Sequence, residues 1–181
     1  MTTYIALLRG INVGKAKRIA MADLRALLEG LGHTDVATLL NSGNVVFRSS
    51  KKASAKLAVE ITAAIAAQLK IDVPVIVKSA KDLATILDGN ALAETADDPS
   101  RLLVAFVQEA GALPALSAIA PLVVPPEQFL VGREAAYLHC ARGILESKAG
   151  EALVGKAGKA ATTRNWATVL KLQALVDKVH G

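Results

Sequence analysis

Cysteine and aromatic residues are scarce in this chain of 181 residues, and each shortage excludes a class of structure. The single cysteine, Cys140, excludes a disulfide within the chain and a cysteine-rich zinc site. Aromatic residues make up 3% of the chain, so the core must be built from aliphatic side chains. Hydrophobic residues still reach 52%, which is enough to bury a core and argues against global disorder.

Long apolar segments are also missing. No apolar run reaches about 18 residues, so we expect no transmembrane helix and no membrane partner. The N-terminus enters a strand-like run directly and lacks the pattern of a secretory signal. Together with the lone cysteine, these absences indicate a cytoplasmic protein. The length fits a single compact domain over residues 1–181, with candidate halves at residues 1–79 and 80–181.

Catalytic and metal-binding patterns are equally sparse. The three histidines, His33, His139 and His180, have no partner at a metal-ligand spacing. His139 precedes Cys140 in a strand-like run, where adjacent side chains point to opposite faces, so the imidazole does not activate the thiol. Two glycine–lysine loops fail the Walker A pattern because alanine follows each lysine. The sequence therefore indicates no metal and no cofactor, and it identifies no catalytic residue.

Basic charge is what the chain has in excess, and two segments carry it. The formal net charge is +5. Residues 9–18 contain four basic residues and no acid, and residues 142–171 contain six basic residues against two acids. Each segment therefore carries a charge of +4, and the remainder is acidic. Such clustering is typical of a protein that binds an anionic partner; a solvated basic face without a ligand is the alternative.

Hydrophobic periodicity predicts an α+β fold. Apolar side chains recur at helical spacing in two segments, residues 21–31 and 57–69. Short apolar runs that read as strands flank these helices, at residues 4–8, 36–40, 45–48 and 75–78. The resulting order, βαββαβ, is that of a ferredoxin-like fold, in which two helices cover one face of an antiparallel sheet.

The second half is predicted to repeat this order incompletely. Strands are expected at residues 101–108, 129–131 and 136–140, with a helix near residues 112–120. Residues 142–162 read as a loop, and the last helix is expected to start near Thr163. The fold is thus predicted to be a ferredoxin-like first half followed by a second half whose last strand is missing or displaced. One continuous α+β sheet is the alternative.

Three short segments contain most of the candidate binding residues, which are mainly basic, turn-forming or helix-capping. Residues 9–15 join a strand to a helix, where main-chain N–H groups favour an anion. Residues 41–44 have the Asn-Ser-Gly-Asn composition of a hairpin turn. In the third segment, residues 162–166, Arg164 could make a bidentate contact with a phosphate. Trp166 could line a site or pack in the core. The candidate ligand-binding residues are Arg9, Asn12, Lys15, Asn41, Ser42, Asn44, Ser147, Lys148, Arg164, Asn165 and Trp166.

Three sequence segments carry a resemblance to a known family. They are Leu7–Gly14 (LLRGINVG), Ser42–Phe47 (SGNVVF) and Thr162–Trp166 (TTRNW). In order and spacing they resemble an uncharacterised bacterial family known only as a domain of unknown function, and the resemblance covers essentially the whole chain. Two positions differ, because Lys15 and the pair Leu145–Glu146 replace the family's glycine and Gly-Arg step. The resemblance implies two ferredoxin-like halves and no particular activity.

The function that these features favour is binding of a phosphorylated small molecule or a nucleic acid through a basic site. An enzyme acting on a phosphorylated or nucleotide substrate and a protein-interaction module are the two alternatives. An RNA-recognition motif is disfavoured, because two candidate strands of the sheets offer one aromatic residue each, Phe47 and Phe106. Nothing in the sequence indicates whether the protein is a monomer or an oligomer.

Overall fold

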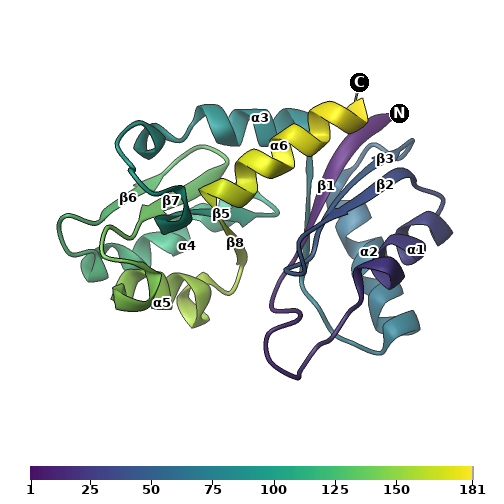
Figure 1. The fold of residues 1–181 in the computed structure, drawn as a ribbon, viewed down its shortest axis with the longest axis horizontal. Helices are drawn as coiled ribbons and strands as arrows, with labels where there is room; N and C mark the ends of the chain where they lie inside the picture. Colours follow the sequence, from purple (N-terminus) through teal and green to yellow (C-terminus); the bar gives the residue numbers. More distant parts are fainter. Residues whose placement is uncertain (181) are drawn as a thin grey trace. The chain divides into compact units, whose positions relative to one another are not determined.

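The computed structural model describes residues 1–180 and contains two four-stranded antiparallel sheets (Figure 1). The chain divides into two compact units. Unit 1 consists of Met1–Lys81 and the C-terminal residues from Leu172, and unit 2 consists of Asp82–Lys171. The predicted α+β class, with two ferredoxin-like halves, is confirmed. Among the described residues, no helix combines the length and the apolar character needed to cross a membrane.

Unit 1 has the predicted βαββαβ order. Its strands follow the spatial order β2-β3-β1-β4, and both helices lie on one face of the sheet (Figure 1). The central strand β1 is buried on both faces, which explains its near-continuous apolar sequence. The elements are β1 (Thr2–Leu8), α1 (Met21–Gly30), β2 (Thr34–Leu39), β3 (Asn44–Ser49), α2 (Ser54–Leu69) and β4 (Val75–Ser79).

Unit 2 repeats this topology strand for strand, in the order β6-β7-β5-β8. Its core lies between one face of the sheet and the helices α4 and α5. On the other face, the Tyr137 hydroxyl donates a 2.6 Å hydrogen bond to Ile86 O and so ties α3 to the sheet. The principal elements are α3 (Ala80–Asp88), β5 (Leu102–Val107), α4 (Leu113–Leu116), β6 (Gln128–Val131), β7 (Ala135–His139), α5 (Lys148–Val154) and β8 (Ala161–Asn165); the last helix, α6 (Trp166–His180), begins in unit 2 and continues into unit 1. Short 3-10 turns connect them: η1 (Ala91–Glu94), η2 (Pro99–Arg101), η3 (Ala110–Ala112), η4 (Ser117–Leu122), η5 (Ile144–Glu146) and η6 (Lys156–Gly158).

The expectation that the last strand of the second half is missing or displaced is wrong. Residues 161–165 form β8, which pairs antiparallel with β5. The β-branched residues Thr162 and Thr163 suit an extended strand better than a helix start. The helix α6 begins one turn later than expected, because Asn165 Oδ1 accepts a 2.9 Å hydrogen bond from the Thr168 N–H and caps it.

Residues 142–162 are not a continuous loop either. Ser147 Oγ accepts a 2.9 Å hydrogen bond from the Gly150 N–H, which caps the short helix α5. Ala149 and Leu153 of that helix belong to the core of unit 2. With α5 in place, unit 2 has all six elements of the βαββαβ order.

Candidate functional site

One asparagine joins the first basic loop to the hairpin turn. Asn12 Nδ2 donates to Ile19 O at 2.9 Å and to Asn41 O at 2.8 Å, and Asn12 Oδ1 accepts from the Ile19 N–H at 2.8 Å. The backbone of Asn12 has a φ of 55°, a left-handed conformation that asparagine adopts more readily than most residues. Both side-chain N–H donors of Asn12 are therefore used inside the protein, and they fix the loop against the hairpin.

This junction borders a cavity of about 320 Å³, lined by Asn12, Arg18, Ile19, Ala20 and Asn41. Arg18 Nη1 donates to Gly14 O at 3.1 Å, which holds the guanidinium beside the loop. Ala20 is the N-cap residue of α1, and no side chain caps the N–H groups of this helix. A helix start carries a partial positive charge. The cavity thus presents one cation and the positive end of a helix.

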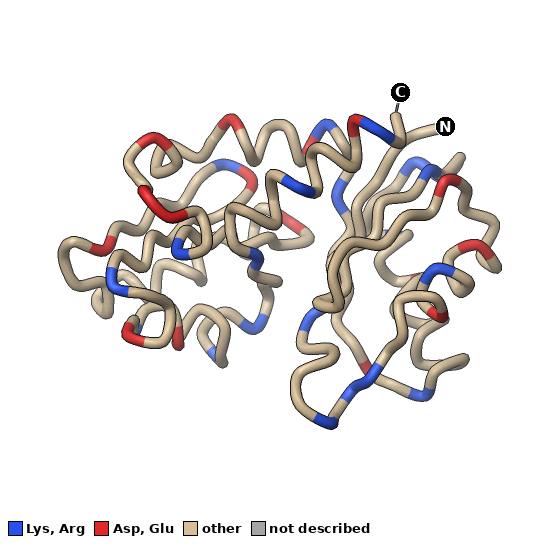
Figure 2. The backbone as a smooth tube through the Cα atoms, viewed as in Figure 1, with Lys and Arg blue, Asp and Glu red and all other residues tan. Residues whose placement is uncertain are grey.

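The charge around this cavity is strongly positive. Basic residues cluster on the loop that precedes α1 (Figure 2). Lys15, Lys17 and Arg18 are exposed, whereas Arg9 is half-buried and its main-chain N–H donates to Pro74 O at 3.0 Å. The exposed acid Asp23 in the first turn of α1 reduces the charge of the segment 9–23 to +3. An anion is therefore the partner that this surface attracts.

The hairpin residues differ in their accessibility. Asn44 is fully buried, and its Nδ2 donates to Leu39 O at 2.8 Å and to Ser42 Oγ at 2.9 Å. Asn41 and Ser42 are exposed at the turn. Gly43 has a φ of 89°, and a Cβ there would lie 2.8 Å from side-chain atoms of Leu8 and Ile11. Asn44 and Gly43 thus shape the turn, and Asn41 is the hairpin residue that reaches the cavity.

The other five candidate residues belong to unit 2. Ser147 is buried as the cap of α5, and Asn165 caps α6. Lys148 is exposed and lines a separate cavity of about 160 Å³. Arg164 lies on β8, where its Nη1 donates to Thr163 O at 3.0 Å. Burial lowers the pKa of Arg164 to about 10, so it keeps its charge at neutral pH. Trp166 is half-buried at the first position of α6.

The six candidates of unit 1 thus lie on the basic loop and the hairpin, and those of unit 2 lie at the start of α5 and at the junction of β8 with α6. The sequence did not single out Arg18, although it lies in the basic segment and directly precedes a helix. That position was the signal that could have identified it.

The lone cysteine is a core residue. Cys140 is fully buried, and this burial raises the pKa of its thiol. Such a thiol stays protonated at neutral pH and is a poor nucleophile. Within residues 1–180, no group of three or more histidine, cysteine, aspartate or glutamate side chains is arranged to hold a metal ion.

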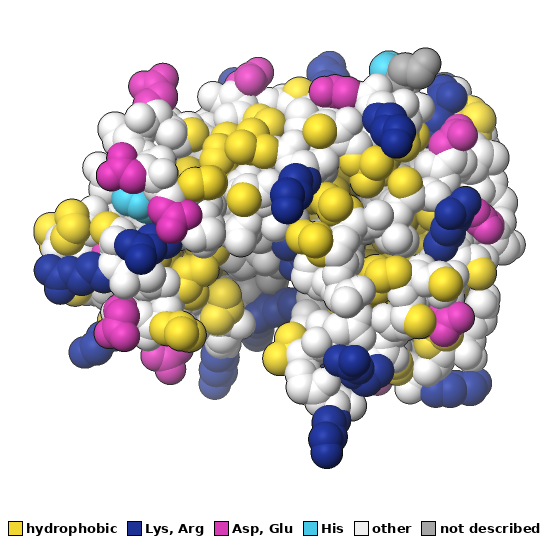
Figure 3. Space-filling model, viewed as in Figure 1, with side chains coloured by type: hydrophobic (Ala, Val, Ile, Leu, Met, Phe, Trp, Pro, Cys, Tyr) yellow, Lys and Arg dark blue, Asp and Glu magenta, His cyan; other side chains and the backbone are white. Residues whose placement is uncertain are grey.

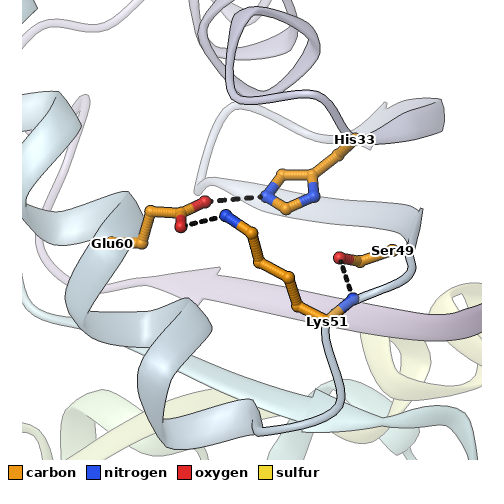
Figure 4. A network of polar contacts seen from close by, with 4 residues as sticks. All are labelled: His33, Ser49, Lys51 and Glu60. Atoms are coloured by element: carbon orange, nitrogen blue, oxygen red, sulfur yellow. Dashed lines mark hydrogen bonds and ion pairs between the residues drawn. The ribbon is translucent and has the colours of Figure 1, made fainter.

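A polar network in unit 1 connects the buried His33 to Glu60 of α2 and to the exposed Lys51 (Figure 4). His33 Nε2 lies 3.3 Å from Glu60 Oε1, and the other carboxylate oxygen of Glu60 pairs with Lys51. The His33 ring also lies against Phe47, with centroids 4.8 Å apart. Burial lowers the pKa of His33 below its usual value; Lys51 adds to this effect, and Glu60 partly opposes it.

This network predicts that the protein loses stability in mild acid. Because the pKa of His33 is lower in the folded chain, the unfolded chain binds the proton more readily below about pH 6.5. The free energy of unfolding should therefore fall as pH drops from 7 to 5, by at most about 1.4 kcal/mol per pH unit from this group. Urea titrations at several pH values measure the slope. His33→Gln should reduce this slope.

Comparison with known proteins agrees with this fold. A family of proteins of unknown function, DUF1697, matches residues 1–137. Among solved structures, a conserved bacterial protein, SP0830 from Streptococcus pneumoniae, superposes with a TM-score of 0.81 at 24% sequence identity, over 97% of this chain and 98% of that chain. No curated protein matches the sequence. The uncharacterised family inferred from the sequence is thus confirmed, and the chain belongs to the DUF1697 family.

Proposed function

We propose that the protein binds a phosphorylated small molecule in the cavity between the basic loop and the hairpin of unit 1. The observation that carries the proposal is the contact between Asn12 and Asn41, which joins segments 29 residues apart beside a cavity that Arg18 lines. The volume of this cavity lies at the lower end of the range for small-ligand pockets, roughly 300–1,000 Å³.

The chemistry of the cavity assigns different roles to its residues. Both N–H donors of Asn12 are already used, so its amide shapes the site and does not supply new donors. Arg18 Nη1 donates one hydrogen bond to Gly14 O, and the rest of its planar guanidinium is suited to bidentate contact with phosphate. Main-chain N–H groups at the start of α1 would face the same phosphate group. Lys15 and Lys17 would raise the local concentration of the anion.

A small ligand is favoured over nucleic acid for a structural reason. Sequence-tolerant binding of single strands relies on aromatic side chains on which bases stack, and residues 9–20 contain none. Binding is favoured over turnover, because the five lining residues include no carboxylate, histidine or nucleophilic side chain. A cytoplasmic location belongs to the same proposal, and the single, buried cysteine supports it.

Removal of Arg18 should weaken phosphate binding selectively. We expect Arg18→Ala to reduce the affinity for ribose 5-phosphate by about tenfold or more, because a hydrogen bond to a charged group contributes about 1.5–3 kcal/mol. Isothermal titration calorimetry of the full chain measures this change. Arg25→Ala is the matched control, since Arg25 is exposed on α1 and pairs with Glu29 at 3.0 Å, outside the cavity.

Two results would contradict the proposal. Equal losses for Arg18→Ala and Arg25→Ala would show that diffuse surface charge attracts the anion, with no defined site. Binding of a short single-stranded oligonucleotide but not of ribose 5-phosphate, with a steep dependence on salt, would instead identify a nucleic-acid-binding loop.

A further inference from the structure

Unit 2 contains a larger cavity, of about 400 Å³, that the sequence did not indicate. Acidic, basic and histidine side chains lie close together on the visible surface of this unit (Figure 3). The cavity draws on three separate segments of the chain. Its lining residues are Thr95, Asp97, Asp98, Arg101, Pro126, Gln128, His139 and Ala141.

One wall is an edge of the sheet. Gln128 of β6 and His139 of β7 are directly opposite each other in the antiparallel register. Side chains at such positions point to the same face and lie next to each other. An amide and an imidazole are therefore held side by side by two strands. Gln128 is exposed and His139 is half-buried, so a ligand has access to both.

The cavity is also lined by a half-exposed ion pair. Asp98 Oδ1 accepts hydrogen bonds from the Ser100 N–H at 2.9 Å and the Ser100 hydroxyl at 2.6 Å. These bonds lower the pKa of Asp98, so its carboxylate stays ionised. Arg101 Nε lies 3.6 Å from Asp98 Oδ2, while its Nη1 donates to Ala141 O at 3.1 Å. The ion pair is thus anchored at both ends.

Three side chains of the cavity have no polar partner within residues 1–180: those of Asp97, Gln128 and His139. A carboxylate accepts hydrogen bonds, whereas an amide and a neutral imidazole both donate and accept them. Hydroxyl groups, which also donate and accept, complement this mixture. With two carboxylates and one guanidinium, the cavity carries a charge of −1 when His139 is neutral, so an anion is disfavoured.

We propose that this cavity binds a small polyhydroxylated molecule of the sugar class that carries no negative charge. Gln128, His139 and Asp97 would bond its hydroxyl groups. Pro126 and Ala141 offer apolar surface to its C–H face. The proposal is independent of the phosphate site in unit 1, because the two cavities share no residue and prefer ligands of different charge.

A matched series of sugars tests the preference. The full-length protein, labelled with ¹⁵N, is titrated with D-glucose, D-glucosamine and D-glucuronate, which share a pyranose ring and differ in charge. We expect saturable shifts of amide signals from residues 95–101, 126–128 and 139–141 with the first two sugars. Glucuronate should bind about tenfold more weakly or not at all.

Variants locate the site and its charge. Gln128→Ala should weaken glucose binding by about tenfold, whereas Gln68→Ala, at an exposed position of α2, should have no effect. Asp97→Asn removes the excess negative charge and should reduce the difference in affinity between glucosamine and glucuronate. The proposal is overturned if no shift saturates, if glucuronate binds as well as glucose, or if Gln68→Ala and Gln128→Ala behave alike.

Discussion

Gly158→Ala is expected to lower the free energy of unfolding by about 3 kcal/mol or more, since overpacking of this kind commonly costs 1–3 kcal/mol and here meets backbone. A Cβ built on Gly158 would lie 1.7 Å from Leu153 O and 2.7 Å from Leu153 C. Both atoms belong to the last turn of α5, so relief requires the helix or the following turn to move. Leu153 is a core residue, and its displacement would disturb the packing beneath β8 as well.

Gly111→Ala is the matched control for this prediction. It lies in the same unit, a Cβ there would meet nothing within 4 Å, and its φ is not in the left-handed range. Its stability should change by no more than about 0.5 kcal/mol. Urea unfolding followed by circular dichroism compares the two variants. If they have the same midpoint, the backbone at residue 158 can shift freely and the steric argument fails.

Much of the fold could be predicted because its signals are local. The α1 and α2 helices show apolar residues at helical spacing, and the Asn41–Asn44 turn is recognisable from four residues. The strand β8 gave no such signal, because four of its five residues are polar and its partner β5 is distant in sequence. Only the pairing with β5, which brings Arg164 opposite Val104, makes Thr162 and Thr163 part of a strand.

The candidate sites were harder to predict than the fold, because residues from separate segments build them. The sequence predicts Asn12 to be a ligand-binding residue, yet in the structure its side-chain amide makes hydrogen bonds to main-chain groups of the protein. The unit 2 cavity combines residues 95–101 with strand ends near residues 128 and 139. From the sequence, His139 is tested only as a metal ligand and as an activator of Cys140, its sequence neighbour. Its strand partner Gln128, which is eleven positions earlier, becomes relevant only once β6 and β7 pair.

Asn12→Ala should be nearly as damaging as Gly158→Ala, and it should act on the loop that forms the proposed phosphate site. The substitution removes three hydrogen bonds, to Ile19 O, Asn41 O and the Ile19 N–H. At about 1 kcal/mol each, with about 1 kcal/mol more for an alanine in the left-handed region, the loss is about 3–4 kcal/mol. Asn12→Gly should lose less, because glycine tolerates the φ of 55°.

Asn41→Ala separates this structural role from ligand contact. Asn41 offers its main-chain oxygen to Asn12, so the substitution keeps that hydrogen bond and should change stability by no more than about 0.5 kcal/mol. Both variants are compared by urea unfolding and by titration with ribose 5-phosphate. If Asn12→Ala is as stable as Asn41→Ala but binds no phosphate, Asn12 contacts the ligand directly. If Asn12→Ala loses stability and binding together, the asparagine holds the loop in the shape that allows Arg18 to line the cavity.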